Sequence, residues 1–339
     1  MKAARLYGPG DIRLEEVADP RPQDGQVLVK VEACGVCPSD IRSYYGTAKQ
    51  TWTPGHEASG VLAQIAGGHS GGPAVGDRVA IDWRHVCGEC FYCLTGNPNF
   101  CERREDFQIA GFAEYTVVPQ AVVHTLPPNV SFDDASFCEP LACVLNAYRV
   151  IHAPFGADVV VIGAGPVGLM HAQVALRHGA RVIVVDKLEP RLAVASQLGA
   201  HDVINASDGD AVAQVLELTH GHGAGAVVVA ANSATAVEQA IAMARKGGVV
   251  NLFAGIYPAT ELRLDPNLVH YSEISLTGSH DYAPAEFALA LRLIEHGIIK
   301  VAPLVSNRYP LSDIAIAFET ARDQQALKSI IHPHDTEVS

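Results

Sequence analysis

The sequence contains no hydrophobic segment of the length that export or membrane insertion requires. Its N-terminal stretch, MKAARLYGPGDIRLEEV, has no apolar core of signal-peptide length. The most apolar run, VVVIGAGPVGLM, is too short and too rich in glycine to cross a bilayer. We therefore expect a soluble cytoplasmic protein, in which cysteines stay reduced and are more often metal ligands than disulfides.

Clusters of lysine and arginine are also missing. The chain has 24 Lys and Arg against 37 Asp and Glu, which gives a formal net charge of −13. Because no basic patch interrupts this acidity, nucleic acid and anionic membrane surfaces are poor candidate partners. The sequence also has no internal repeat and no low-complexity segment, so solenoid and disordered architectures are not expected.

Length and composition indicate a globular protein with more than one domain. The chain has 339 residues, of which 48% are hydrophobic and 18% are charged. This composition is typical of a protein with a large buried core. Since 339 residues exceed what one core usually supports, we expect two domains.

The pattern of short segments changes near residue 145. Before this point, β-type runs separated by Gly, Pro and Asp turns predict an irregular β-rich domain: QVLVKVEACGV, GVLAQIA, DRVAI and AEYTVVP. After it, buried strands alternate with amphipathic helices: VVVIG, RVIVVD, HDVIN, AVVVAA, GGVVNLFA and EISLTGS are the predicted strands. Such alternation predicts an α/β domain with a parallel sheet covered on both faces.

The C-terminal tail is expected to pack back on the first domain. From about Pro284 the chain returns to helix with AEFALALRLIEHG, continues through a short strand, and ends in a predicted helix over 311–327. We therefore assign residues 1–145 and 286–339 to one domain and residues 146–285 to the other.

Four of the eight cysteines lie within fifteen residues, in CGECFYCLTGNPNFC. They follow the spacing C-x2-C-x2-C-x7-C, in which short gaps let a loop fold its thiolates around one tetrahedral ion. A closed set of four thiolates leaves no position for substrate. The pattern therefore predicts a structural zinc site formed by Cys87, Cys90, Cys93 and Cys101.

A glycine-rich turn opens the second domain. Gly163, Gly165 and Gly168 form G-x-G-x-x-G between a strand and a helix, with Pro166 and Val167 completing the turn. Such a turn lets a pyrophosphate approach the helix N-terminus, where unpaired N–H groups favour an anion. The pattern predicts a dinucleotide site.

Residues near the end of the next strand bear on the choice of coenzyme. Asp186 follows Gly168 by eighteen residues, where a carboxylate can accept both ribose hydroxyls of NAD and repel the 2′-phosphate of NADP. Lys187 and Arg191 lie close by and leave some use of NADP open.

The first domain holds a second set of possible metal ligands. CGVCPSD contains Cys34 and Cys37, and PGHEASG contains His56 beside Glu57. A thiolate and an imidazole from separate segments, with a carboxylate beside the imidazole, can form an open zinc site whose remaining position takes water or substrate.

The whole chain resembles the zinc-containing medium-chain alcohol and polyol dehydrogenases. The segments that carry the resemblance occur in the family's order: CGVCPSD, GHEASG, GDRV, the four-cysteine loop, GFAEY, EPLA, VVVIGAGPVG and RYPLSDIAIAFE. The resemblance implies a Rossmann coenzyme domain, a GroES-like catalytic domain, NAD, and two zinc ions per chain. EPLA looks like the sorbitol dehydrogenase branch, because the ethanol-type branch has a cysteine there.

The resemblance also implies roles for individual residues of the open site. Cys37 and His56 would be catalytic zinc ligands, and Cys34 would be structural. Ser39 would bond the substrate oxygen and pass its proton on, and Asp40 would orient the ligand histidine. Which of two carboxylates binds zinc directly, and which through water, stays open: the candidates are Glu57 and Glu139.

The chain departs from this family at two places. Arg42 occupies a position where many relatives have a relay histidine, and a guanidinium cannot act as a base. GSHDYAP keeps Tyr282 of an arginine–tyrosine pair that contacts polyol hydroxyls in sorbitol dehydrogenases, but it has Asp281 in place of the arginine. We expect both Asp281 and Tyr282 to contact the substrate.

Three functions are consistent with these patterns. The first is NAD-dependent oxidation of a polyol or sugar alcohol, in which zinc lowers the pKa of the substrate hydroxyl and the nicotinamide receives hydride. The second is oxidation of an amino alcohol of the threonine type, with Asp281 facing the ammonium. The third is an NAD-binding sensor without turnover. A homodimer or homotetramer formed through the edge segment EISLTGS is expected.

Overall fold

The computed structural model describes residues 1–46, 51–68, 71–103, 109–323 and 326–335, and the chain forms two compact units. Unit 1 contains Met1–Ala142, Tyr282–Gly297 and Val301–Ser339, and unit 2 contains Cys143–Asp281 and Ile298–Lys300. The sequence placed these boundaries at 145/146 and 285/286. Most of the C-terminal tail therefore packs with the N-terminal part of the chain.

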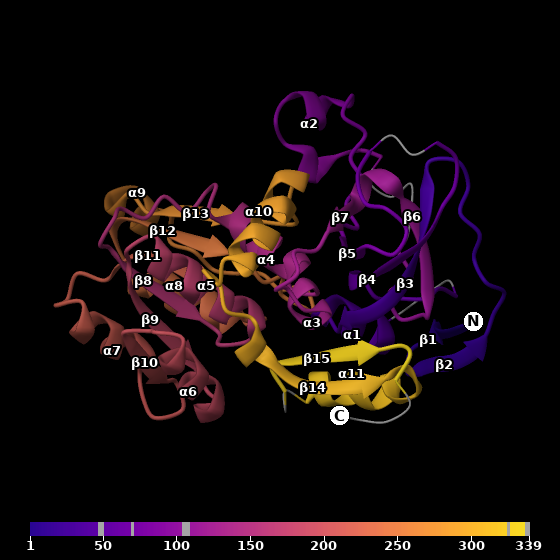
Figure 1. Cartoon of the computed structure of the whole chain (residues 1–339). Coiled ribbons are helices and arrows are strands. Elements are labelled where there is room, and N and C mark those ends of the chain that lie inside the picture. The colour runs from indigo at the N-terminus through magenta and orange to yellow at the C-terminus, as the bar shows by residue number, and fades with distance from the viewer. Residues whose placement is uncertain (47–50, 69–70, 104–108, 324–325, 336–339) are drawn as a thin grey trace. The chain divides into compact units, whose positions relative to one another are not determined.

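Unit 1 is rich in short strands (Figure 1). Its strands are β1 (Lys2–Gly8), β2 (Asp11–Glu16), β3 (Gln26–Gly35), β4 (Glu57–Ile65), β5 (Arg78–Ile81), β6 (Tyr115–Pro119), β7 (Val123–Thr125), β14 (Val305–Pro310) and β15 (Lys328–His332). Its helices are α1 (Pro38–Tyr45), α2 (Phe91–Leu94), α3 (Phe132–Ala135), α10 (Pro284–Glu295) and α11 (Ile314–Arg322), and α4 (Cys138–Ala147) crosses the boundary between the units. Short 3-10 turns are η1 (Pro98–Phe100), η2 (Gln120–Val122), η3 (Ala302–Leu304) and η4 (Leu311–Asp313).

The main sheet of unit 1 has β3 near its centre. The strand order is β14-β15-β3-β4-β5-β7, β6 also pairs with β3, and β1 and β2 form a separate antiparallel pair. In β3, Val27, Val29 and Val31 alternate with less buried residues and enter the hydrophobic core, as expected for a strand with one face inward. This alternation fixes which face of β3 is buried.

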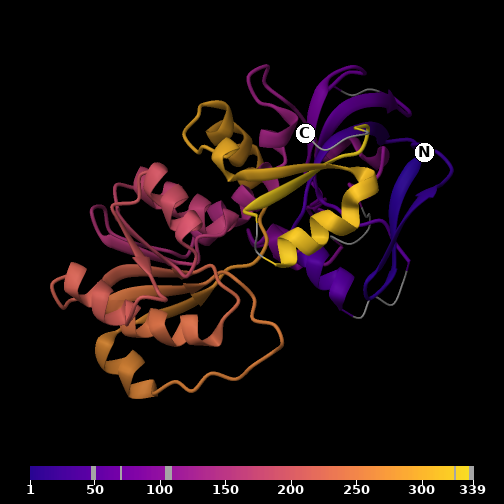
Figure 2. The same cartoon turned by 90° about the horizontal axis from the view of Figure 1, so that it is seen from below.

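The C-terminal segment adds two strands and a helix to unit 1. Strands β14 and β15 pair in parallel, and α11 lies beside them (Figure 2). Ile314, Ala317 and Phe318 form the buried face of α11, at the spacing of an amphipathic helix. The helix predicted over 311–327 is observed in part, as η4 followed by α11, which ends at Arg322; residues 326–327 are not helical, and residues 324–325 lie outside the described residues.

Unit 2 is a six-stranded parallel sheet with the order β10-β9-β8-β11-β12-β13. The strands are β8 (Asp158–Ile162), β9 (Arg181–Asp186), β10 (Asp202–Asn205), β11 (Ala224–Val229), β12 (Ala244–Leu252) and β13 (Ser275–Gly278). The helices are α5 (Pro166–Arg177), α6 (Glu189–Gln197), α7 (Ala211–Leu218), α8 (Ala234–Met243) and α9 (Pro266–Ser272). The strand order reverses between β8 and β11, which is where doubly wound sheets bind ligands.

Both faces of this sheet are covered. Consecutive residues of β11 are all buried, and β8 and β9 each contain four consecutive buried residues. Because neighbouring side chains of a strand point to opposite faces, such runs require packing on both sides. The parallel sheet predicted from the sequence is therefore confirmed.

A substitution at Gly60 tests how tightly β3 and β4 are packed. A Cβ atom on Gly60 would lie 1.9 Å from the backbone oxygen of Lys30, so Gly60→Ala requires the two strands to separate. We expect a loss of unfolding free energy of about 2 kcal/mol or more, measured by urea denaturation of the zinc-loaded protein. Gly8→Ala is the control, because a Cβ there meets no atom within 4 Å. Equal stability of the two variants would contradict this packing.

Candidate zinc and coenzyme sites

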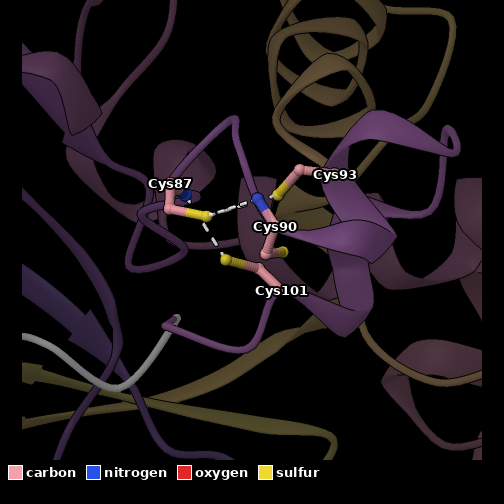
Figure 3. Close-up of side chains that lie close together, drawn as sticks. All are labelled: Cys87, Cys90, Cys93 and Cys101. Carbon is pink, nitrogen blue, oxygen red and sulfur yellow. Dashed lines mark hydrogen bonds between the residues drawn. The ribbon is translucent and has the colours of Figure 1, made fainter.

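Four cysteines of one loop converge in unit 1 (Figure 3). The Sγ atoms all lie within 4.8 Å of one another: they belong to Cys87, Cys90, Cys93 and Cys101. Helix α2 begins after Cys90 and returns Cys93 toward it, and η1 precedes Cys101. All four cysteines are free of disulfides. A donor set of four thiols at this separation fits one tetrahedral zinc ion.

Backbone amides of the loop favour the thiolate form that zinc requires. The N–H of Cys90 donates to the Sγ of Cys87 at 3.3 Å, and the N–H of Cys87 donates to the Sγ of Cys101 at 3.3 Å. Desolvation opposes ionisation of Cys87, but the hydrogen bond from the Cys90 amide, with side-chain hydrogen bonds of Cys101, Cys90 and Arg103, outweighs it and lowers the pKa of Cys87 to about 7. Hydrogen bonds also lower the pKa of Cys90, whereas burial raises that of Cys93 to about 12, so the loop favours the thiolate form at Cys87 and Cys90.

A second group of donors lies where β3 and β4 meet. Ligand atoms of Cys37, His56 and Glu57 lie within 4.8 Å of one another. Cys37 follows β3 and is the N-cap of α1, and His56 directly precedes Glu57, the first residue of β4. Cys34 is fully buried in the core and is not a member of this group. A thiol, an imidazole and a carboxyl group fit an open zinc site with one position left for substrate.

The side chain of Asp40 is buried and contacts two of these donor residues. One carboxylate oxygen accepts the N–H of Cys37 at 3.0 Å, and the other lies 3.6 Å from Nδ1 of His56. Burial alone would lower the pKa of His56, but the charges of Asp40 and Cys37 hold that pKa well above its ordinary value. Asp40 thus orients the imidazole and increases the negative field around it.

Ser39 lies at the same site. Its hydroxyl donates to the Sγ of Cys37 at 3.2 Å. Arg42, which is on the same short helix, is exposed and carries no group that could accept a proton. The structure therefore brings the Ser39 hydroxyl into contact with a candidate ligand.

Glu139 is held by a residue that the sequence did not single out. The indole N–H of Trp83 donates to Oε1 of Glu139 at 3.1 Å, and the Trp83 ring lies 5.0 Å from the His56 ring between centroids. Glu139 is not a member of the three-donor group around Cys37. No short motif could have indicated this contact, because 56 residues separate Trp83 from Glu139.

The glycine turn of unit 2 joins β8 to α5. Gly163 has a φ of 106°, a left-handed value that favours glycine, and a Cβ on Gly168 would lie 1.8 Å from the Gly163 oxygen. Gly165 is the N-cap of α5, and Pro166 and Val167 begin its first turn. The turn therefore presents the N-terminus of a twelve-residue helix, and its three glycines add no side chains there.

Asp186 ends β9 and binds backbone amides of this region. Its Oδ2 accepts the N–H of Ala164 at 2.6 Å, and its Oδ1 accepts those of Lys187 and Leu188 at 2.7 and 2.9 Å. A carboxylate has about four acceptor positions, so about one remains for a ribose hydroxyl in this conformation. Arg191 lies nearby, with a guanidinium nitrogen 3.9 Å from the Cβ position of Gly165.

Asp281 and Tyr282 lie where the chain passes from unit 2 to unit 1. Asp281 has a left-handed φ of 64° and is mostly buried. The hydroxyl of the fully buried Tyr282 donates to Oδ1 of Asp82 at 2.9 Å, so in this conformation it does not also donate to a substrate. Contact of either residue with a substrate stays a prediction.

The pair of Asp82 and Tyr282 leads to a test of pH-dependent stability. Burial raises the pKa of Asp82 to about 7, against the opposing hydrogen bonds of the Arg84 amide and Tyr282. The folded chain therefore keeps this proton up to about pH 7, whereas the unfolded chain loses it near pH 4. Stability should fall as the pH rises from 5 to 8, by an order of 2–3 kcal/mol from this group alone.

The Asp82→Asn variant should lose this part of the pH dependence, because an amide oxygen can accept the same two hydrogen bonds without ionising. Urea denaturation at pH 5 and pH 8 measures the difference. The exposed Asp208 supplies a control, and Asp208→Asn should behave as the wild type does. Identical pH dependence in the two variants would contradict the prediction.

Family models match most of the chain. Residues 23–128 match the alcohol dehydrogenase GroES-like domain, and residues 166–296 match the zinc-binding dehydrogenase domain. The combination of a GroES-like unit with a Rossmann unit, expected from the sequence, is confirmed. Among the described residues, no helix is both long and apolar enough to cross a bilayer.

Curated relatives cover nearly the full length. A sorbitol dehydrogenase of Halalkalibacterium halodurans is 34% identical, over 97% of this chain and 98% of the relative. A D-arabitol-phosphate dehydrogenase of Enterococcus avium is 31% identical, over 99% of both chains. An L-threonine 3-dehydrogenase of Bacillus licheniformis is 31% identical, over 97% of this chain and 98% of the relative.

Solved structures share the whole fold. A zinc-binding dehydrogenase of Sinorhizobium meliloti, bound to NADP, has a TM-score of 0.91 at 28% identity and covers 98% of this chain and 99% of its own. A protein of Escherichia coli called a short chain alcohol dehydrogenase, complexed with NADH, has a TM-score of 0.89 at 27% identity, with coverages of 98% and 99%. With both domain families matched and relatives above 30% identity over nearly its whole length, the chain belongs to the zinc-dependent medium-chain alcohol and polyol dehydrogenases.

Proposed function

We propose that this dehydrogenase oxidises a secondary alcohol of a polyol or sugar alcohol to the ketone and transfers the hydride to NAD. The observation that carries the proposal is the three-donor group of Cys37, His56 and Glu57 with the Ser39 hydroxyl 3.2 Å from the Cys37 sulfur. A site that only stabilised the fold would not need a hydroxyl beside an open metal position. This argues against an NAD-binding sensor without turnover.

The donor geometry favours one assignment of the ligands. Cys37, His56 and Glu57 would hold the catalytic zinc, and the four-cysteine loop would hold a structural one. Glu139, whose Oε1 accepts a hydrogen bond from Trp83, would act through water or not at all. Glu57 belongs to the group of three donors and Glu139 does not, which separates two carboxylates that the sequence motif leaves equivalent.

The residues of the site suggest how the proton leaves the substrate. When bound, zinc acts as a Lewis acid on the substrate hydroxyl, and NAD accepts the hydride. Asp40 lies on the Nδ1 side of His56, so Nε2 would be the nitrogen available to hold the ion. Rotation of the Ser39 hydroxyl from the Cys37 sulfur toward the substrate would let it take the proton. Arg42 cannot relay it further, so water would carry it to solvent.

The charge of the chain favours a neutral substrate. Relatives include enzymes named for sorbitol, for D-arabitol phosphate and for L-threonine, so the family alone does not select among these classes. A carboxylate at Asp281 would accept hydrogen bonds from vicinal hydroxyls and repel phosphate, and the net charge of −13 acts in the same direction. The same carboxylate could pair with the ammonium of an amino alcohol, which keeps the threonine-type substrate as the second candidate.

NAD is proposed as the coenzyme because Asp186 would repel a 2′-phosphate. Solved relatives carry NADP in one case and NADH in another. Arg191 beside the glycine turn is the residue that would support NADP. Asp186 is the last residue of β9, where the ribose is expected, whereas Arg191 lies further along the chain in α6. We therefore favour NAD over NADP.

We also propose a homodimer or homotetramer in the cytoplasm. Strand β13 is the edge of the unit 2 sheet, and Leu276 in it and Leu268 and Tyr271 in α9 are exposed. An apolar sheet edge of this kind is usually covered by a second chain. The eight cysteines, all free of disulfides, suit a reducing compartment.

Metal analysis tests the two zinc sites. Purified protein should contain about two zinc ions per chain. Cys37→Ser should contain about one and lose turnover with its fold intact, since this site lies beside an already packed core. Cys93→Ser should also lose one ion but should unfold at lower temperature, because its loop has little else to hold it. Equal loss of stability in the two variants would contradict the assignment of roles.

An NADH-formation assay tests the substrate and the coenzyme. Neutral polyols should have higher kcat/KM than sugar phosphates, hydroxy acids or threonine, and NAD should be preferred over NADP. Asp281→Ala should lower kcat/KM for the best polyol by about 1.5–3 kcal/mol, the value of a charged hydrogen bond, and leave the KM for NAD unchanged. A sugar phosphate as best substrate would contradict the electrostatic argument, and unchanged kinetics would exclude Asp281.

A further inference from the structure

A buried lysine contacts one of the proposed zinc ligands. Lys328 is the first residue of β15, its side chain is only 4% exposed, and its ammonium forms an ion pair with Oε2 of Glu57. The ammonium also lies 5.8 Å from the centre of the Phe137 ring. This buried ion pair places the side chain of Lys328 directly against a proposed zinc ligand.

Three neighbouring strands place Lys328 against Glu57. Strand β3 lies between β15 and β4, and its last residue, Gly35, pairs with Ile330 on one side and with Glu57 on the other. A Cβ on Gly35 would lie 2.2 Å from Oε2 of Glu57 and 2.8 Å from Cε of Lys328. The ion pair thus crosses β3 over a position where any larger residue would collide with it.

The ion pair makes the two oxygens of the Glu57 carboxylate different, because Lys328 contacts Oε2. A carboxylate can bind a metal through one oxygen or through both. Two-oxygen binding would occupy coordination space that an open zinc site needs for its substrate. An ammonium held against one oxygen opposes two-oxygen binding, because it competes with the metal for that oxygen. It also holds the carboxylate in one orientation.

We infer that Lys328 is a positioning residue that restricts Glu57 to one-oxygen binding and so keeps a coordination position open for the alcohol. This inference rests on the proposed role of Glu57 as a zinc ligand. Lys328 touches neither substrate nor metal in this role. It acts through Glu57, and Gly35 provides the space in which the two side chains meet.

Cobalt substitution tests the inference without relying on activity. Co²⁺ replaces zinc, and its visible d–d absorption weakens when coordination rises from four to five. The Cys37→Ser chain, which keeps only the four-cysteine site, supplies the spectrum to subtract. The wild type should show a four-coordinate second site. Lys328→Met should keep the second ion but show the weaker five-coordinate spectrum, with kcat lowered by about tenfold or more.

The control is another lysine–glutamate pair of the same sheet. Lys30 and Glu32 form an ion pair at 2.7 Å on a more exposed part of β3, so Lys30→Met should leave the cobalt spectrum and kcat unchanged. Gly35→Ala should resemble Lys328→Met, because its methyl group would displace the pair.

The outcomes separate this inference from the proposed function. A wild type that binds one ion, with no change in Cys37→Ser, would refute the open zinc site itself. A wild type with two ions and a Lys328→Met variant with an unaltered spectrum would overturn only the role of Lys328. Loss of the second ion in Lys328→Met would also overturn it, because Lys328 would then hold the ligand in place rather than restrict it.

A second variant covers the case in which Lys328→Met does not fold. Lys328→Arg keeps the charge, but its planar fork can grip both oxygens of a carboxylate. The affinity of the second site for zinc, measured by competition with a chelator, should then fall by about tenfold or more. Unchanged affinity in Lys328→Arg would overturn the inference.

Discussion

The pairing of β3 with β4 is the constraint on which the candidate zinc site depends. The register that places Gly35 opposite Glu57 also sets the positions of Cys37, just beyond β3, and His56, just before β4. Close contact of the strands at Gly60 leaves little freedom to change that register. A shift of one residue would turn Glu57 to the other face of the sheet, because side chains alternate along a strand. The register of the two strands therefore brings the donors together.

Features formed within one segment of the chain were predictable, and contacts between distant strands were not. The cysteine spacing, the glycine turn and the alternation of unit 2 each depend on neighbouring residues, and the structure realises all three locally. The hairpin of β1 and β2, and strand β15, lack a long alternating pattern and were missed. Lys328 lies in that missed strand, 271 positions beyond its partner Glu57, so only the sheet order reveals the contact.

Asp186 shows why a correct motif does not settle the details of a site. The sequence pattern places a carboxylate at the end of a strand, and this placement is observed. The pattern does not include the three backbone amides that the carboxylate accepts, because they come from two loops whose positions depend on the fold. Asp186 therefore has a role in shaping the glycine turn besides any contact with a ribose. Replacing Asp186 would alter both the glycine turn and any ribose contact. A loss of coenzyme binding would therefore not by itself identify a ribose contact.

The balance of charge explains why such a donor set suits a divalent cation. Asp40, Glu57 and Glu139 are all at most 7% exposed, and the buried Lys328 forms an ion pair with Glu57. Uncompensated buried charge is costly. The same negative surroundings raise the pKa of His56, so they attract a proton to the imidazole despite its burial. At the proposed site a dication would take the place of that proton and, together with Lys328, would offset the Cys37 thiolate and the carboxylates. The field that raises the pKa of His56 is thus the field that would hold zinc.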